Sequence, residues 1–353
     1  MTTILVINPG ATSTKYAVFR DNEAVLDQTV PHAATDLEIY PTVIAQEQYR
    51  LDLILQGLTD ACIDLASLDV VVGRGGLLKP ITGGVYSVND TMVEELRQGK
   101  RLDHASNLGA ILADRIGKQL AIPAFIVDPV SVDEMDPVAR ISGLPELPRV
   151  SFVHALNSKA VARKVAQRIG KRYEEMNLVV AHLGTGISIT PHRKGRMVDV
   201  NNASEEGPFS PDRCGGLPAR SLIRLCFSGK YTEAELLKKI VGSGGMYAYL
   251  GTKDLRNAEK MADEGDGQAS LILAAMAYQI VKEIGAMAAV LAGSVDRIVI
   301  TGGMAHSQRL VKAIADKVAF IAPIEVIPGE EEMEALAAGA LRVLAGEESV
   351  LEY

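Results

Sequence analysis

The chain has 353 residues, which is more than one compact core usually takes, so its length favours two domains. Hydrophobic residues make up 48% and charged residues 23% of it, which excludes a disordered chain, a collagen-like rod and a small disulfide scaffold. With 36 Lys and Arg against 44 Asp and Glu, the formal net charge is −8, which argues against nucleic acid or an anionic membrane surface as the partner.

Short apolar runs alternate with helical periods along the chain, which is the pattern of an α/β protein. The strands are predicted at 4–7, 16–19, 70–72, 124–127, 178–181, 187–190, 297–300 and 324–327. The helices are predicted at 49–61, 93–98, 105–120, 155–169, 232–240, 267–292, 308–318 and 331–344.

The N-terminal segment, the longest apolar stretch and the cysteines indicate the cellular location of the protein. The opening segment MTTILVINPG has no charged leader and is typical of a buried strand. The longest apolar stretch, 269–292, is interrupted by Gln279, Lys282 and Glu283, whereas a bilayer span needs about 20 apolar residues. The three cysteines are sparse and lack the spacing of a zinc site. We therefore expect a cytoplasmic protein.

Two segments half a chain apart share one plan. ILVINPGATSTKYAVF and LVVAHLGTGISIT each predict a strand, a tip rich in Gly, Ser and Thr, and a second strand. Glycine allows close backbone approach, and hydroxyl and N–H groups suit phosphate oxygens. Either segment alone also fits an ordinary hairpin, but two such tips at the starts of two halves favour a phosphate site.

The stretch 133–148 has three prolines and no apolar period, so it is the predicted junction between domains. The first domain is then 1–148 and the second 149–330. The last helix, with the rest of 331–353, is expected to pack back on the first domain.

Polar side chains stand where predicted strands end, namely Asn8, Arg74, Asp128 and His182. Ligands of open α/β sheets bind at the carboxyl ends of strands, so the four together are more suggestive than any one. Individually, Asn8 and Asp128 also fit turns before a proline, and His182 fits a buried, hydrogen-bonded histidine.

The loop at 201–218 places Arg213 between prolines and glycines, outside any predicted helix or strand. Arginine is suited to bidentate binding of phosphate or carboxylate, although a surface arginine is an equal alternative here. The neighbouring Cys214 is interpreted as a small filler residue and not as a nucleophile.

These segments carry a resemblance over the whole chain. INPGATSTK, GRGGLLKP, HASN, VHALNSK, HLGTGIS, EGPFSPDRCGGLP, GTKDLR, ITGG and VIPGEEE occur in this order. In them the chain resembles the acetate and butyrate kinase family, within the actin, hexokinase and Hsp70 ATPase superfamily, and its EGPFSPDRCGGLP loop is similar to the butyrate form. The resemblance implies a duplicated actin-like ATPase (ribonuclease H-like) α/β fold, with two domains around a nucleotide cleft.

The implied reaction transfers the γ-phosphoryl group of ATP to butyrate or a similar short-chain fatty acid, giving butanoyl phosphate and ADP, reversibly. A carboxylate acceptor is already ionised at neutral pH, so positioning and positive charge are needed but no catalytic base is. Superfamily relatives that phosphorylate hydroxyls or activate water usually carry Asp in the first hairpin, where this chain has Asn8.

The same resemblance implies roles for single residues. Arg74 and Arg213 would flank the substrate carboxylate and the transferring phosphoryl group, and His154 would hydrogen-bond that group. Residues implied to face phosphate or substrate are Asn8, Ser13, Lys15, His104, His182, Gly184 and Gly186. Ala11 stands where acetate kinases have a serine, so one hydroxyl contact is missing.

The nucleotide and its metal ion are implied to bind elsewhere along the chain. Asp128 and Glu331 would hold the Mg²⁺ of MgATP, largely through water, although the adjacent Glu330 and Glu332 leave the register open. Residues implied to contact the adenosine part are Asp254, Arg256, Gly302 and Gly303.

Other functions stay open on the sequence. An acetate, propionate or isobutyrate kinase differs only in the acyl pocket, and a non-kinase actin- or Hsp70-like ATPase shares the fold. A sugar-kinase-type regulator would need a DNA-binding extension before the first strand. The resemblance implies ATP, ADP, a short-chain carboxylate and an acyl phosphate as ligands, and a homodimer or higher homo-oligomer as the assembly.

Overall fold

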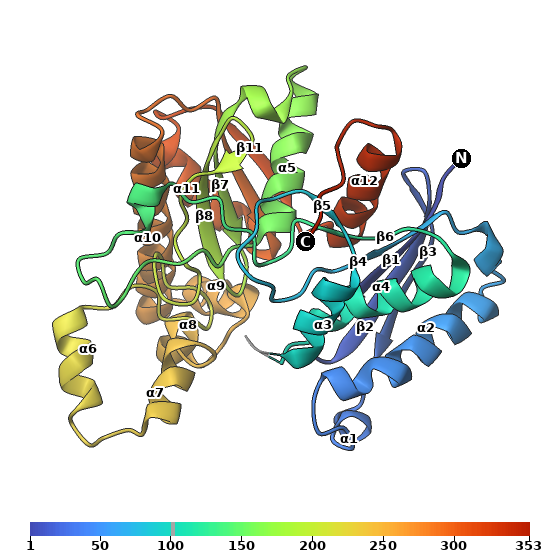
Figure 1. The fold of residues 1–353 in the computed structure, drawn as a ribbon. Coiled ribbons are helices and arrows are strands. Elements are labelled where there is room, and N and C mark those ends of the chain that lie inside the picture. Colours follow the sequence, from blue (N-terminus) through green and yellow to red (C-terminus); the bar gives the residue numbers. More distant parts are fainter. Residues whose placement is uncertain (100–102) are drawn as a thin grey trace. The chain divides into compact units, whose positions relative to one another are not determined.

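In the computed structural model, which describes residues 1–99 and 103–353, the chain divides into two units (Figure 1). The first comprises Met1–Val132 and Glu331–Tyr353, and the second comprises Asp133–Glu330. The proline-rich stretch 133–148 therefore belongs to the second unit, and the C-terminal segment belongs to the first.

The first unit is built on a six-stranded mixed sheet in the order β3-β2-β1-β4-β6-β5. The strands are β1 (Thr3–Pro9), β2 (Ser13–Arg20), β3 (Glu23–Pro31), β4 (Val70–Gly73), β5 (Val85–Ser87) and β6 (Ala124–Val127). β1, β2 and β3 form an antiparallel meander, whereas β1, β4 and β6 run parallel. The carboxyl ends of three parallel strands thus meet at one edge, where ligands of such sheets bind.

Helices cover this sheet. They are α1 (Ala34–Leu37), α2 (Glu47–Asp60), α3 (Asp90–Gln98), α4 (Asn107–Leu120) and α12 (Glu332–Leu344). α4 lies directly on β4, because a Cβ at Gly73 would come within 2.1 Å of the Gly109 carbonyl oxygen and one at Gly109 within 2.3 Å of the Arg74 carbonyl oxygen. α12 packs on β1, β4 and β6, where a Cβ at Gly339 would meet Val127 at 2.5 Å. These glycines allow the close approach that fixes the end of β4.

The second unit repeats the plan of the first. Its sheet has the order β11-β10-β7-β8-β9, with β7, β8 and β9 antiparallel in sequence and β7, β10 and β11 parallel. The strands are β7 (Asn177–Leu183), β8 (Ile187–Arg193), β9 (Arg196–Met197), β10 (Arg297–Gly302) and β11 (Ile324–Pro328). Counted along the chain within each unit, both sheets place the third, second, first and fourth strands in this order, followed by one more parallel strand, β6 in the first unit and β11 in the second. The first sheet has β5 as an additional antiparallel edge strand. The shared order confirms the predicted duplicated α/β fold.

The two faces of the second sheet are covered by different helices. Leu178 and Val180 pack with α5 (Ala155–Arg168), whereas Val179 and Ala181 face the larger core that contains α10 (Gly267–Val290). This alternation is the two-residue period of a strand buried on both faces. The remaining helices are α6 (Ala219–Cys226), α7 (Glu233–Ile240), α8 (Gly245–Leu250), α9 (Leu255–Asp263) and α11 (Gln308–Val318).

By length and composition alone, α10 is also apolar enough to cross a membrane, and it is the one such helix among residues 1–99 and 103–353. Its buried residues, among them Met276 and Ile280, belong to the core of the second unit. They pack there beside Ile300 of β10.

All the predicted strands are present, and β6 and α11 have the predicted bounds. The strands β3, β5 and β9 and the helices α1, α6, α8 and α9 were not predicted. β3 has no buried residue, so it lacks the alternating apolar pattern by which a strand is recognised. α6 likewise buries none of its residues.

Candidate active site

The first cluster of candidate residues lies at the ends of β1 and β4. β1 continues past the predicted 4–7, so Asn8 lies within the strand, opposite Lys15 on β2. Arg74 directly follows β4, and its N–H donates to the Ile7 carbonyl oxygen at 2.8 Å. The pairing of β1 with β4 therefore brings Asn8 and Arg74 to the same edge of the first sheet.

A carboxylate of the same unit joins these two side chains. Glu332, at the start of α12, accepts a hydrogen bond from Asn8 Nδ2 at 2.8 Å through Oε2 and one from Arg74 through Oε1. The side chains of Arg74 and Glu332 are only 18% and 24% exposed, so this ion pair is partly shielded from solvent. The amide and the guanidinium together are thus arranged as donors to a carboxylate.

The tip between β1 and β2 (residues 10–13, the first tip) carries the predicted phosphate contacts. The Gly10 N–H donates to the Ser13 carbonyl oxygen at 2.8 Å, which closes the turn. Ala11 and the ammonium-bearing Lys15 are exposed, and Ser13 is half-buried. Hydroxyl, ammonium and backbone N–H groups are therefore within reach of an anion at this tip.

The two carboxylates predicted to hold Mg²⁺ both lie in the first unit and both have left-handed backbone. Asp128 has a φ of 38° and Glu331 a φ of 39°, a conformation uncommon outside glycine and frequent at functional sites. Asp128 is 1% exposed and accepts the Gly84 N–H at 2.8 Å, whereas Glu331 precedes the first turn of α12.

The carboxylates of Asp128 and Glu331 suit a Mg²⁺ ion that keeps most of its water ligands. Within residues 1–99 and 103–353, no group of three or more His, Cys, Asp or Glu side chains is placed to hold a metal ion. Mg²⁺ usually keeps several waters and binds through one or two carboxylates plus substrate phosphates. Asp128 and Glu331 fit that mode, since both are oxygen donors and neither belongs to a protein cage.

His104 lies within electrostatic reach of Arg74. Desolvation lowers the pKa of His104, and the charge of Arg74 lowers it further against an opposing effect of Asp103. Its Nδ1 is 2.9 Å from Ser106 Oγ at the start of α4. A histidine held neutral beside an arginine can hydrogen-bond a ligand without adding charge.

The second cluster lies at the end of β7 in the second unit. His182 is 1% exposed and its Nδ1 lies 2.8 Å from Asn157 Oδ1 on α5. The Asn157 amide nitrogen donates to the Glu330 carbonyl oxygen at 3.0 Å, so the amide oxygen faces the imidazole and Nδ1 carries the proton. The buried Nε2 of His182 makes no hydrogen bond to any residue that the structure describes, and it lies 3.4 Å from Glu330 Oε1.

His154 stacks on His182. The ring centroids are 3.8 Å apart with an interplanar angle of 9°, and His154 Nδ1 lies 2.9 Å from Ser188 Oγ on β8. His154 immediately precedes α5, whose first turn carries Asn157 three residues later. The segment VHALNSK thus supplies both a candidate phosphoryl ligand and the group that orients the second histidine.

The turn at Gly184 and Gly186 (residues 182–186, the second tip) is packed against Arg213. The Gly184 N–H donates to the Gly186 carbonyl oxygen at 3.2 Å. A Cβ at Gly186 would lie 2.6 Å from Arg213 Nη1, so a larger residue would displace the guanidinium. Two predicted site residues far apart in sequence are therefore in contact.

In the part of the chain that the structure describes, no carboxylate binds the guanidinium of Arg213. Ser210 Oγ accepts the Arg213 N–H at 3.2 Å and donates to the Thr185 carbonyl oxygen, which ties the loop to the second tip. Arg213 Nη1 donates to Ser204 Oγ at 3.4 Å, and its buried Nε has no partner. Desolvation lowers the pKa of Arg213, with Asp212 opposing. A partly buried guanidinium with spare donors suits an anionic ligand.

The thiol of Cys214 is a poor nucleophile in this setting. Burial raises its pKa above the ordinary value, so the reactive thiolate is disfavoured at neutral pH. This agrees with its interpretation as a filler residue.

The residues predicted to contact adenosine lie at two helix starts of the second unit. Asp254 caps α9 by accepting the Arg256 N–H at 2.9 Å, and its carboxylate also binds the Arg256 side chain at 2.6 Å. Arg256 is exposed and Asp254 half-buried. Gly302, with a φ of 88°, ends β10, and a Cβ there would lie 2.4 Å from the Leu183 carbonyl oxygen; Gly303 follows.

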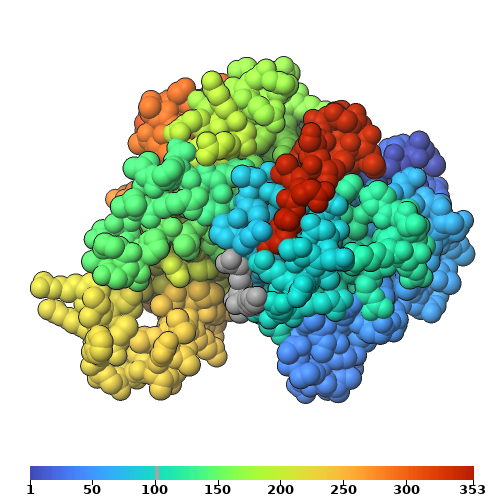
Figure 2. All heavy atoms as spheres, viewed as in Figure 1, coloured from blue at the N-terminus to red at the C-terminus, as the bar shows by residue number. Residues whose placement is uncertain are grey.

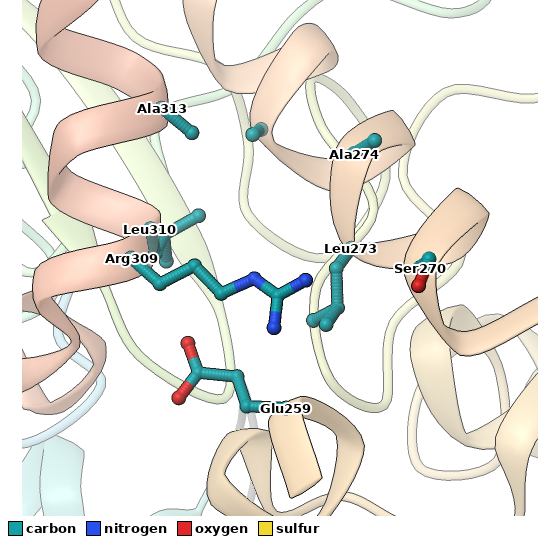
Figure 3. Close-up of a pocket in the computed structure, with 8 residues that line it drawn as sticks. Glu259, Ser270, Leu273, Ala274, Arg309, Leu310 and Ala313 are labelled. Carbon is teal, nitrogen blue, oxygen red and sulfur yellow. The ribbon is translucent and has the colours of Figure 1, made fainter. Parts of the chain in front are cut away.

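A cavity of about 140 Å³ lies among α9, α10 and α11 (Figure 3). Arg309 and Glu259 extend into it, and Leu273 and Leu310 supply apolar walls.

Several residues of these clusters were not predicted. Asn157 stands three residues after His154, a helical spacing that places both at one end of α5, but no pattern shows which histidine it orients. Ser204 and Ser210 lie within the loop around Arg213 and were passed over as loop residues. Glu332 was named only as an alternative metal ligand, although it binds Arg74.

The chain is similar to proteins of known family and structure. The model of the Acetokinase family matches residues 149–336. Butyrate kinase 2 and butyrate kinase 1 of Clostridium acetobutylicum are 51% and 50% identical to this chain, over 99% of it and 99% of each of them. The crystal structure of the acetate kinase of Porphyromonas gingivalis matches with a TM-score of 0.81 at 20% identity, covering 98% of this chain and 100% of that one.

The site and these relatives define the class of protein. It is a phosphotransferase with a carboxyl group as acceptor, on a duplicated actin-like fold. The chain belongs to the acetokinase family, which confirms the resemblance found in its motifs.

Proposed function

We propose that this chain transfers the γ-phosphoryl group of ATP to butyrate or a similar short-chain fatty acid, forming butanoyl phosphate and ADP, and also catalyses the reverse reaction. The two butyrate kinases that match over 99% of the chain support butyrate as the acceptor.

One observation of the structure carries the proposal for the acceptor. Asn8 and Arg74 together bind a carboxylate, that of Glu332. The same two donors suit the carboxylate of a fatty acid, and Asn8 has no basic group to remove a proton. An acceptor that arrives ionised needs none.

The second unit supplies groups for the phosphoryl group. Arg213 places a guanidinium with spare donors beside the second tip, where it would stabilise charge on the equatorial oxygens of the transferring group. His154 and His182 would hydrogen-bond that group, their rings held by Ser188 and Asn157. The chemistry is then positioning and charge stabilisation.

The nucleotide and its ion complete the proposal. Asp254 and Arg256 would contact adenosine at the start of α9, a helix that borders the cavity of Figure 3, and Gly302 and Gly303 would do so at the end of β10. Asp128 and Glu331 would hold Mg²⁺ through water. When bound, the ion would neutralise phosphate charge and orient the β- and γ-phosphates.

The test is acyl hydroxamate formation from ATP, butyrate and hydroxylamine. The proposal predicts butyryl hydroxamate in proportion to enzyme, and none when butyrate or ATP is omitted. ATP hydrolysis that is unaffected by butyrate and yields no hydroxamate would instead indicate an actin- or Hsp70-like ATPase.

The preferred acyl chain follows from kinetics. One methylene in an apolar pocket changes the specificity by about 1–3 kcal/mol, so neighbouring acids differ by roughly 10- to 200-fold. We expect kcat/KM to peak at butyrate in a series of straight and branched C2 to C6 acids. A peak at acetate, propionate or isobutyrate would reassign the substrate within the same class.

The assembly and location are part of the proposal. α6 and α7 stand out from the rest of the second unit (Figures 1 and 2), and Ile223 and Phe227 there are 59% and 88% exposed. An exposed apolar helix face suits self-association into a homodimer or higher homo-oligomer. Three cysteines without a disulfide partner fit a cytoplasmic location.

A further inference from the structure

A buried cation stands behind the first tip. Arg50 on α2 is 0% exposed. Its Nη1 donates to the carbonyl oxygens of Gly10 (2.9 Å) and Ser13 (3.1 Å) and to Thr14 Oγ1 (2.9 Å). Its Nε and Nη2 both donate to Gln46 Oε1, at 3.1 and 2.8 Å. Every one of these acceptors is uncharged.

No carboxylate neutralises this guanidinium in the described part of the chain, where its partners are all amide, carbonyl or hydroxyl oxygens. Desolvation lowers the pKa of Arg50, and the nearby Tyr49 opposes the shift. Burying a cation without a counter-ion is costly, and arginine keeps its proton even so. A fold that keeps such a charge at the back of a ligand-facing turn gains a positive field at that turn.

Arg50 also decides which groups the first tip presents. The carbonyl oxygens of Gly10 and Ser13 are bound to Arg50, and that of Thr12 accepts the His32 N–H at 2.9 Å. The N–H groups of Ala11 and Thr12 have no partner within residues 1–99 and 103–353, and both residues are exposed. The oxygens thus face the body of the unit, and N–H groups face outward, which is the polarity of an anion-binding nest.

The hydrogen bonds around Arg50 continue into a fixed chain. Because Thr14 Oγ1 accepts from Arg50, its proton is free to donate to His32 Nε2 at 2.8 Å, which leaves His32 Nδ1 to donate to Tyr49 Oη at 3.2 Å. Burial and the charge of Arg50 lower the pKa of His32, which keeps the ring neutral as this chain requires.

We propose that Arg50 is the positioning residue of the first tip: it turns the tip carbonyl oxygens inward and places a permanent positive charge behind a phosphate held by the outward N–H groups. The proposal rests on the proposed function for the claim that the first tip binds phosphate of the nucleotide or acyl phosphate.

The test measures anion binding apart from catalysis. Inorganic tripolyphosphate is titrated calorimetrically into the full chain and into Arg50→Met, Arg50→Lys and Gln46→Leu. We expect Kd to rise at least tenfold in Arg50→Met. It should rise less in Arg50→Lys, because lysine keeps the charge but lacks the forked donors of the guanidinium. It should rise least in Gln46→Leu, which only removes the acceptor that holds the guanidinium in place. Arg97→Met is the matched control. Arg97 on α3 binds Glu47, which lies on α2 as Arg50 does, but the contacts of Arg97 are with Glu47 and not with the first tip. We expect its Kd to stay within twofold of that of the wild type.

Kinetics separate positioning from folding. For ATP with butyrate, Arg50→Met should raise KM and lower kcat, and Arg50→Lys should recover part of both. If Arg50→Met fails to fold, Arg50→Lys and Gln46→Leu carry the comparison.

Folded Arg50 variants that bind tripolyphosphate as the wild type does would overturn the proposal, as would a wild type that binds none. A wild type that binds tripolyphosphate through Arg50 but yields no butyryl hydroxamate would refute the proposed function and leave the role of Arg50 standing.

Discussion

Arg74 is bound by Glu332, a residue 258 positions later in the chain, and the ion pair links the end of β4 to the start of α12. The contact places a carboxylate on the guanidinium that we assign to the acceptor. Arg74 therefore has two possible roles, as a partner of α12 and as a ligand of the substrate, and variants of the two residues separate them.

Arg74→Ala should lower kcat at least 100-fold, the scale of removing one group that stabilises developing charge. Glu332→Gln should lower it less than tenfold, because the guanidinium remains and the amide oxygen can still accept its hydrogen bond. Steady-state kinetics with saturating ATP and butyrate measure both. Equal losses in the two variants would mean that Arg74 acts through the ion pair and not on the substrate.

Arg213 is expected to be as important. Arg213→Ala should lower kcat at least 100-fold, since it removes the guanidinium that packs against Gly186 of the second tip. Arg213→Lys should recover a small part, because an ammonium keeps the charge but cannot form two parallel hydrogen bonds. Near-normal turnover of Arg213→Ala would remove Arg213 from the site.

The contact between the second tip and Arg213 gives an independent test. In Gly186→Ala the new methyl would lie 2.6 Å from Arg213 Nη1, and the flexible end of the arginine would move away. We expect a folded protein whose kcat falls at least tenfold. Gly216→Ala, in the loop that carries Arg213, is the control, since the nearest contact of its new methyl would be 3.8 Å away, and its kcat should stay within twofold. Similar kinetics for the two variants would contradict the packing.

Acid should destabilise the second unit through His192. Its ring is 0% exposed and bonded to Tyr173 and Thr190, and burial holds its pKa well below the ordinary value, with Lys159 and Arg163 lowering it further. The unfolded chain binds a proton below about pH 6.5 that the folded chain excludes, so the free energy of unfolding falls as pH falls.

The measurement is denaturant unfolding from pH 7.5 to 5. In His192→Gln the free energy of unfolding should be lower than that of the wild type at pH 7. It should also depend less steeply on pH, with a slope smaller than the wild-type slope by up to about 1.4 kcal/mol per pH unit. His306→Gln, at an exposed histidine, is the control and should keep the wild-type slope. An unchanged slope in His192→Gln would show that this histidine does not control acid stability.

The sequence predicts the central strands and the repeated plan because those strands are apolar and end in small or polar residues. β3 escapes prediction because none of its residues is buried, and its place in the sheet depends on pairing with β2. Helix α6 escapes for a related reason, since its apolar residues contact no core of this chain.

The sequence indicates single candidate residues, but it does not show the contacts between them. The motifs indicate Arg74, Arg213 and His182, whereas the partners Glu332, Ser204 and Asn157 depend on contacts across 258, 9 and 25 positions. The fully buried Arg50 lies in a helix whose pattern gives no sign of a buried cation. Which polar side chain turns inward is decided by the acceptors that the fold presents to it, and those become visible only in three dimensions.

The central claim is that the acceptor is a carboxylate that is already ionised when it binds. No proton then has to be removed from it, so replacing Asn8 with a residue that can act as a base should not speed the reaction. In Asn8→Asp the donor to Glu332 Oε2, now at 2.8 Å, becomes a second carboxylate beside the first. At roughly 4 Å and an effective dielectric constant near 20, a like-charge pair costs up to about 4 kcal/mol, less with screening.

By the proposal, the new carboxylate of Asn8→Asp would also stand beside the anionic acceptor and the γ-phosphoryl group and would repel both. The most direct measurement is therefore kcat/KM for butyrate in the wild type, in Asn8→Asp and in the neutral control Asn8→Ala, from pH 6 to 9. We expect kcat/KM of Asn8→Asp to fall about ten- to several-hundredfold, since about 1.4 kcal/mol corresponds to a tenfold change. This loss should exceed that of Asn8→Ala, and Asn8→Asp should gain no activity on alcohols. An Asn8→Asp variant as fast as the wild type, or one that phosphorylates a hydroxyl, would contradict the account.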